Sequence, residues 1–192
     1  MARVDWRTKP GGGCHRPGAW AFNQRVSFTY TEVGRTRNDD LPAGYRHVRR
    51  HAVVGQGDAT FRAVVAGMRD FGIHRLAGMR IRTHGAPRLG SEFQTGLGFS
   101  KARLWVPCRI VWFIDTPAAY GYGFGTMPGH PERGEEAFEV TLRGNGEVHF
   151  DIRAFSRPAT WYARLGGPVT TMAQSWATDR YLTSAHKLAS PT

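Results

Sequence analysis

The chain has 192 residues, of which 41% are hydrophobic and 12% aromatic, and 26 Lys and Arg against 15 Asp and Glu give a formal charge of +11. This composition is too apolar for a disordered basic tail and predicts one globular domain. The longest apolar run, Ile110 to Ile114, is far shorter than the roughly 20 residues of a membrane-spanning helix, so no membrane span is expected.

The first residues lack the apolar core of a secretory signal, which predicts a cytoplasmic protein. Cys14 and Cys108 provide neither a disulfide framework nor the spacing of a zinc site, so both are expected to be reduced. No set of His, Cys and Asp residues has metal-ligand spacing, and no dinucleotide or phosphate-loop motif is complete. We therefore expect no metal and no cofactor.

The positive charge is concentrated in one part of the chain. Residues 1–110 carry 19 Lys and Arg against 7 Asp and Glu, whereas residues 111–192 carry 7 and 8. The densest cluster runs from Arg46 to His51, and in an alternating strand its charges divide between two faces. The arginine excess is consistent with either phosphate recognition or a coding bias. Binding to nucleic acid or an anionic surface through this basic half is kept as a third hypothesis, after the two given below.

The pattern predicts a mobile N-terminal tail over residues 1–24, one domain over 25–188 and a C-terminal tail over 189–192. Alternation predicts strands over 25–30 and 45–54. Apolar residues at helical spacing then predict a helix with Asp58 as its N-cap and Gly72 as its stop.

Beyond this helix the apolar period changes to two and predicts six further strands. Their expected ranges are 78–83, 91–99, 104–115, 120–126, 135–142 and 148–155. Asn145-Gly146 predicts a hairpin between the last two. After Ser156, with Pro158 in the first turn, a long helix is expected, with a kink or break at Gly166-Gly167-Pro168.

This order of elements predicts an α+β fold in which a curved antiparallel sheet of six to seven strands wraps a long C-terminal helix. It resembles the helix-grip superfamily of START lipid-transfer domains, polyketide cyclases and birch-pollen-type allergens. The resemblance implies an apolar cavity between the sheet and the long helix.

The segment from Gly125 to Glu136 is dense in ionisable groups that suit acid–base chemistry, among them His130, Glu132 and Arg133. Glu136 shares a strand face with Phe138, so its carboxylate should enter the apolar side of the sheet. Two interpretations stay open for Glu136: an ion pair with Arg133 or a bond to a backbone amide that fixes the fold, or a group that serves a ligand. His130, between two prolines, is also consistent with a turn-stabilising role.

The strand over 120–126 alternates aromatic residues with Gly121, Gly123 and Gly125. One face of this strand is therefore aromatic and the other is bare. Bare positions permit either sharp bending of the sheet or the close approach of another group.

Four segments resemble the uncharacterised bacterial and plant family called domain-of-unknown-function nineteen-ninety. They are Phe28 to Gly34 (FTYTEVG), Leu41 to Tyr45 (LPAGY), Gly125 to Phe138 (GTMPGHPERGEEAF), and Phe155 to Pro158 (FSRP) followed by Trp161 to Pro168 (WYARLGGP). The resemblance covers about residues 25–188 and implies no agreed activity. Carried over onto this chain, it points to Tyr30, Glu32, His130, Glu132, Arg133, Glu136, Arg157 and Tyr162 as candidate site residues.

The leading hypothesis is a protein that binds a small lipophilic molecule in a cavity lined by Trp112, Tyr122, Phe124, Phe138 and Trp176. The second is a cyclase- or hydratase-type enzyme in which Glu136 and His130 transfer protons. The sequence leaves the oligomeric state open, a homo-oligomer included.

Overall fold

The computed structural model describes residues 27–97, 103–159 and 167–190, and for Leu97 and residues 167–176 it describes the backbone alone. The elements in chain order are η1 (Arg35–Arg37), β1 (Arg46–Gln56), α1 (Gly57–Arg69), α2 (Gly72–Leu76), β2 (Arg80–Thr83), β3 (Glu92–Leu97), β4 (Leu104–Thr116), β5 (Ala119–Thr126), β6 (Glu132–Leu142), β7 (Glu147–Pro158) and α4 (Gly167–Ala189).

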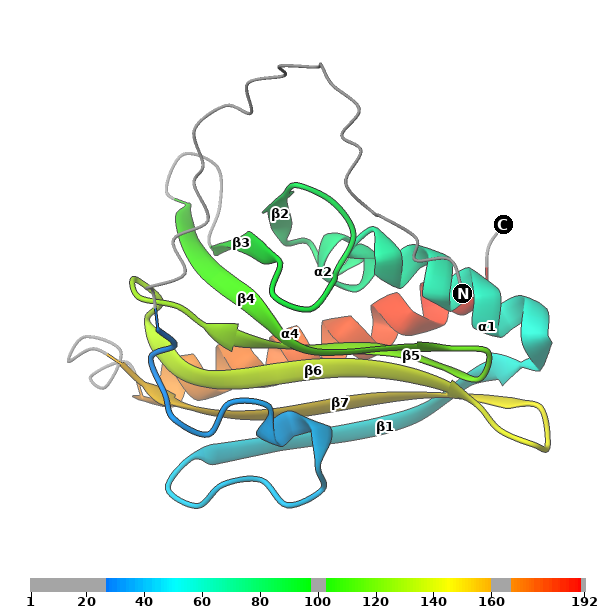
Figure 1. Ribbon diagram of the computed structural model, residues 1–192, viewed down its shortest axis with the longest axis horizontal. Coiled ribbons are helices and arrows are strands. Elements are labelled where there is room, and N and C mark those ends of the chain that lie inside the picture. Colours follow the sequence, from blue (N-terminus) through cyan, green and yellow to red (C-terminus); the bar gives the residue numbers. More distant parts are fainter. Residues whose placement is uncertain (1–26, 98–102, 160–166, 191–192) are drawn as a thin grey trace, which may run out of the picture.

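The strands form one antiparallel sheet in the order β1-β7-β6-β5-β4-β3-β2, and the helices α1, α2 and α4 cover one of its faces (Figure 1). This is the helix-grip arrangement that the element order predicts. The Asn145-Gly146 hairpin between β6 and β7 is confirmed, with Gly146 at a φ of 84° that glycine adopts without strain. No helix among the described residues is long and apolar enough to cross a membrane.

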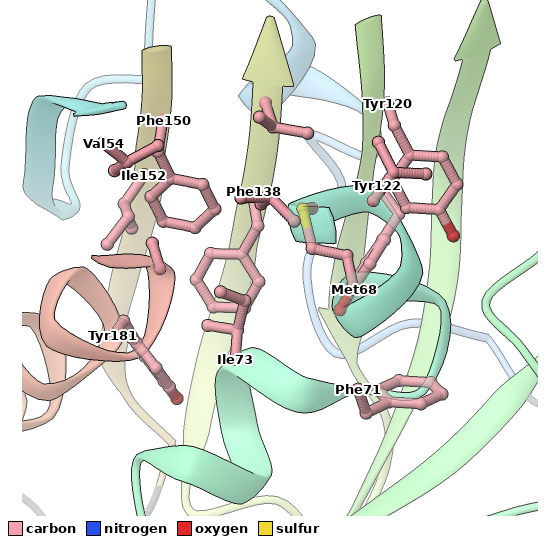
Figure 2. Close-up of a cluster of buried hydrophobic side chains, with 14 of the residues drawn as sticks. Val54, Met68, Phe71, Ile73, Tyr120, Tyr122, Phe138, Phe150, Ile152 and Tyr181 are labelled. Carbon is pink, nitrogen blue, oxygen red and sulfur yellow. The ribbon is translucent and has the colours of Figure 1, made fainter. Parts of the chain in front are cut away.

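The helix-covered face carries the main core, because inward side chains of the strands meet the apolar stripes of the helices. Figure 2 shows Tyr122 and Phe138 of the sheet beside Met68 of α1 and Ile73 of α2. Tyr181 of α4 packs edge-on against Phe138 with ring centroids 4.8 Å apart. All five side chains are at most 4% exposed, so they form a closely packed part of the core on this face.

The opposite face of the sheet is covered by residues 27–45, which include η1 and are coloured blue in Figure 1. Tyr30, Leu41 and Phe155 form a second, smaller buried cluster there. The sheet is therefore buried on both faces over part of its area, which explains the aromatic residues in the segment that precedes β1.

Three sequence predictions about local structure are wrong. The described part of the expected strand over 25–30 is irregular and makes one backbone bond, from Thr29 N–H to the Thr126 carbonyl at 3.2 Å. Gln56, not Asp58, is the N-cap residue of α1. That helix ends at Arg69, and Gly72 begins α2 because Phe71 adopts a left-handed backbone with φ of 55°.

The predicted start of the final helix is also wrong. Ser156 and Pro158 belong to β7, opposite Gly134 and Glu132 of β6, because the β6 partner strand is long enough to extend β7 this far. The helix that the structure describes begins at Gly167. Most of the stretch between lies outside the described residues.

Candidate functional site

A cavity of about 420 Å³ lies on the helix-covered face, between the strands and the two helices α2 and α4. Most of its lining is apolar, contributed by residues such as Val48, Met79, Val106, Phe124, Ala154 and Ala177. Among the described lining residues, those with ionisable side chains are His74, Cys108, His130, Glu132, Glu135, Glu136 and Tyr181. The volume falls in the range of small-molecule sites.

Glu136 enters this cavity from β6, as its place on the face of Phe138 predicts. Its register partners are Phe124 on β5 and Ala154 on β7, so its immediate neighbours in the sheet are apolar. Among the described residues the carboxylate makes no hydrogen bond or ion pair. Burial, with a further contribution from Glu132, raises the pKa of Glu136 to about 8. At pH 7 the group is therefore mostly a neutral acid.

Neither of the bonds proposed to fix Glu136 in place, to Arg133 or to a backbone amide, exists within the described part of the chain. Arg133 lies opposite Arg157 in the β6–β7 register and is exposed. A carboxyl group that enters an apolar cavity without a partner costs free energy in the empty protein. The first of the two interpretations therefore finds no bond among the described residues, and a role toward a ligand stays a prediction.

His130 lies in the short connection between β5 and β6. Its Nδ1 is 3.0 Å from the backbone nitrogen of Glu132, which donates to it, and 3.1 Å from the backbone oxygen of the same residue. Burial lowers the pKa of His130 to about 4, opposed by the bond to that backbone. The ring is therefore neutral at pH 7, and its loop contacts leave Nε2 as the nitrogen not held by Glu132.

His74 is a cavity residue that the sequence reasoning missed. Its side chain is 1% exposed, and neither ring nitrogen has a hydrogen-bond partner among the described residues. Five aromatic rings surround it at centroid distances of 5.2 to 5.9 Å: Phe71, Phe93, Phe124, Phe138 and Tyr181. Burial, and to a smaller extent Arg75, lowers its pKa to about 3. Nothing in the local pattern distinguishes His74 from an exposed residue of a short helix.

Glu135, the neighbour of Glu136, is bound on the opposite face of the sheet. One carboxylate oxygen accepts from Tyr30 Oη at 2.9 Å and from the Gly34 amide at 2.7 Å. The other accepts from the Thr36 amide at 2.8 Å and from the Thr36 hydroxyl, which itself accepts from Trp112 Nε1 at 2.8 Å. The carboxylate that fixes the N-terminal segment to the sheet is therefore Glu135.

Trp112 was expected to line the cavity, but it lies on the opposite face of the sheet. Strict alternation from Val106 would place it inward with Cys108 and Ile110, but a β-bulge between Ile110 and Trp112 shifts the register against β5. One extra residue in a strand moves every later side chain to the other face.

The remaining candidates are distributed over three places. Phe124, Glu132 and Glu136 line the cavity with His130, whereas Tyr122 and Phe138 are fully buried in the packed core beside it. Tyr30 belongs to the opposite face. Tyr162 lies outside the described residues, and Trp176 falls in the part of α4 described by its backbone alone.

Glu32 and Arg157 both contact Tyr45, which ends the LPAGY segment. Tyr45 Oη donates to Glu32 Oε2 at 2.8 Å, and this bond lowers the pKa of Glu32. The Arg157 guanidinium lies over the Tyr45 ring, 4.7 Å from its centroid. The contacts of these candidates attach the N-terminal segment to β7 and leave them outside the cavity lining.

The bare face of β5 is occupied by side chains of this chain itself. A Cβ at Gly123 would overlap the indole of Trp112, and one at Gly125 would overlap the Tyr30 hydroxyl. Of the two explanations left open, sharp bending or close approach, close approach therefore accounts for Gly123 and Gly125. Within the described ranges, no group of three His, Cys, Asp or Glu side chains could hold a metal ion.

Residues 29–184 match the model of a family described as a domain of unknown function, DUF1990. The chain belongs to this family. A UPF0548 protein from Deinococcus radiodurans is 29% identical to this DUF1990 chain over 174 residues, which cover 84% of the chain and 87% of the relative. A UPF0548 protein from Arabidopsis thaliana is 48% identical over 78 residues, covering 36% of this chain and 38% of its own.

Solved structures agree on the fold. A hypothetical protein from Helicobacter pylori superposes with a TM-score of 0.61 at 13% identity, covering 78% of this chain and 92% of that one. A norcoclaurine synthase point mutant from Thalictrum, in complex with a transition-state analogue, superposes with a TM-score of 0.51 at 9% identity, covering 79% and 100%. At such identities the likeness concerns the fold of the DUF1990 domain alone.

Proposed function

We propose that this protein binds a small, mostly apolar molecule in the cavity between the sheet and α4. The observation that carries the proposal is the cavity itself: about 420 Å³, with an apolar lining and one carboxyl group, Glu136, that has no partner in the described chain. Sites for small molecules combine an apolar wall with a few polar groups that orient the ligand.

The test is occupancy of the cavity. Native mass spectrometry of the purified protein, before and after incubation with a lipid extract, should show an added mass that an apolar fluorescent probe displaces. Failure of every apolar probe and every extract component to bind would contradict the proposal. The same spectrum reports the oligomeric state.

A matched pair of variants assigns the binding to the cavity. Ala154→Phe adds a ring to a lining residue of β7, whereas Ala59→Phe adds the same ring to an exposed position of α1. We expect Ala154→Phe to lose probe binding and Ala59→Phe to keep it, with the circular dichroism of both unchanged. Equal binding by the two variants would place the probe elsewhere.

A second candidate function is proton transfer to a ligand in the same cavity. Glu136 with a pKa of about 8 is a neutral acid at pH 7 and can give a proton to a ligand. His130 with a pKa of about 4 is neutral, and because its Nδ1 accepts from the Glu132 amide its proton lies on Nε2, which can donate a hydrogen bond to the charge that develops on the ligand. If the bound molecule is converted, Glu136→Gln should abolish turnover without loss of fold, and turnover retained by this variant would exclude the role.

A further inference from the structure

The charge of the cavity lining restricts the class of ligand. Among the described residues other than Glu135, its ionisable side chains are two acids, two histidines, a thiol and a phenol, and no Lys or Arg contributes. Glu135 contributes to the wall, but its carboxylate is bound on the opposite face of the sheet by donors from residues 27–45.

The two histidines, the thiol and the phenol of the lining supply no positive charge. Burial lowers the pKa of both His74 and His130 far enough to keep them neutral at pH 7. Burial raises the pKa of the Cys108 thiol and of the Tyr181 phenol, so these stay uncharged as well. The lining can therefore carry negative charge at Glu136, and its described residues offer no cation.

Arg46 is the cation whose position comes under question, because it lies on a strand that contributes to the cavity. It lies on the helix-covered face of β1, opposite Ser156 of β7, which lines the cavity. Arg46 itself is not part of the lining, and β1 is the edge strand of the sheet. Within the described lining, an anionic ligand would thus face acids and neutral groups, which disfavours carboxylates and phosphates.

We infer that the ligand is a lipophilic amine, whose ammonium group pairs with Glu136 while its apolar body fills the rest of the cavity. This inference rests on the proposed function and names its ligand class. Phe124, directly opposite Glu136 in the β5–β6 register, places an aromatic ring beside the ammonium position. An aromatic face attracts a cation, so the same position offers charge pairing and a cation–π contact together.

The pairing has a measurable proton balance. In the empty cavity at pH 7 Glu136 holds its proton, and an ammonium group that arrives charged stabilises the carboxylate. The Glu136 O–H bond breaks, the carboxylate remains in the cavity, and the proton passes to the buffer. Binding should therefore release up to about one proton per amine near pH 7 and strengthen as the pH rises towards 8.

Three probes with one carbon skeleton test the inference: n-octylamine, n-octanol and octanoate, each competing with an uncharged fluorescent probe. We expect the amine to bind at least about tenfold more tightly than the alcohol, since charge-assisted bonds are the stronger ones, and octanoate to bind worst. Calorimetry in two buffers of different ionisation enthalpy measures the proton released by the wild-type protein.

Two variants locate the effect. Glu136→Gln should reduce amine affinity to that of the alcohol and abolish proton release. Glu139→Gln, on the same strand but bound to Arg153 on the opposite face, should keep the preference for the amine.

The outcomes separate the two proposals. Octanol binding as tightly as the amine, octanoate binding best, or an amine preference that survives Glu136→Gln would each overturn the amine inference and leave the apolar binding site in place. Failure of all three probes together with every lipid extract would instead remove the proposed function. Proton release by the wild-type protein keeps the inference testable even if Glu136→Gln does not fold.

Discussion

Two adjacent glutamates on β6 should respond in opposite ways to the same substitution. Glu135 is 3% exposed and accepts bonds from Tyr30, Gly34 and Thr36, while Glu136 enters the cavity without a partner in the described chain. Glu→Gln keeps the shape of the side chain and replaces one acceptor oxygen by an NH₂ donor. The pair therefore separates the loss of bonds from the loss of volume.

The magnitude for Glu135→Gln follows from the donors that face it. Whichever oxygen is replaced, a backbone N–H of Gly34 or Thr36 then meets another N–H, because each oxygen accepts from one of these amides. Hydroxyl groups can rotate to adapt, whereas amides cannot. One lost bond to a charged acceptor and one unsatisfied buried donor together cost about 3–5 kcal/mol.

Urea unfolding at pH 7, followed by circular dichroism, measures both variants. Glu135→Gln should lower the free energy of unfolding by about 3–5 kcal/mol. For Glu136→Gln the free energy of unfolding should instead rise by about 3 kcal/mol, because at pH 7 ionisation of Glu136 stabilises the unfolded wild-type chain, whereas in the folded chain its pKa is about 8, and Gln cannot ionise in either state. Equal losses in the two variants, or a loss below about 1 kcal/mol for Glu135→Gln, would refute this assignment of roles.

Three further predictions follow from the same contacts. Between pH 4.5 and about 8 the folded state holds a proton on Glu136 that the unfolded state has lost, so wild type should lose stability relative to Glu136→Gln as the pH rises, by up to about 1.4 kcal/mol per pH unit; a constant difference over this range contradicts the raised pKa. His74→Leu removes two ring nitrogens that have no partner in the described chain and should raise the free energy of unfolding at pH 7 by about 1 kcal/mol. His74→Leu should also reduce the loss of stability as the pH falls from 6.5 towards 3, because in this range His74 binds a proton in the unfolded chain but not in the folded one. Acid unfolding curves of the variant that coincide with those of the wild type would count against this. Gly125→Ala places a methyl group against the Tyr30 hydroxyl and should lower the free energy of unfolding by about 2 kcal/mol, while Gly144→Ala, with nothing within 4 Å of the added methyl group, should lower it little. Thermal unfolding of the two variants measures this, and equal melting temperatures would show that Tyr30 can move aside.

Sequence reasoning went furthest where local pattern decides the structure. Alternation identified β1 and β4 to β7, the Asn145-Gly146 turn fixed their last hairpin, and the phase of β6 placed Glu136 inward. It failed at Trp112, because a bulge of one residue reverses the faces of a strand without a marker in the pattern. It also failed at residues 27–30, where aromatic side chains pack on the sheet from an irregular backbone.

The sequence by itself determined the order of elements, the antiparallel sheet with a long C-terminal helix, and the family, because these depend on periodicity and on local motifs. Only the tertiary structure decided which glutamate is bound and which is available. Glu135 and Glu136 are adjacent and chemically identical, and their roles differ because residues 99 to 105 positions away, at Tyr30, Gly34 and Thr36, cover one face of β6. In the same way the cavity brings His74 of α2 to the same space as Glu136 of β6. Burial and partners are set by contacts between distant segments, and these contacts shift the pKa values on which the proposed chemistry depends.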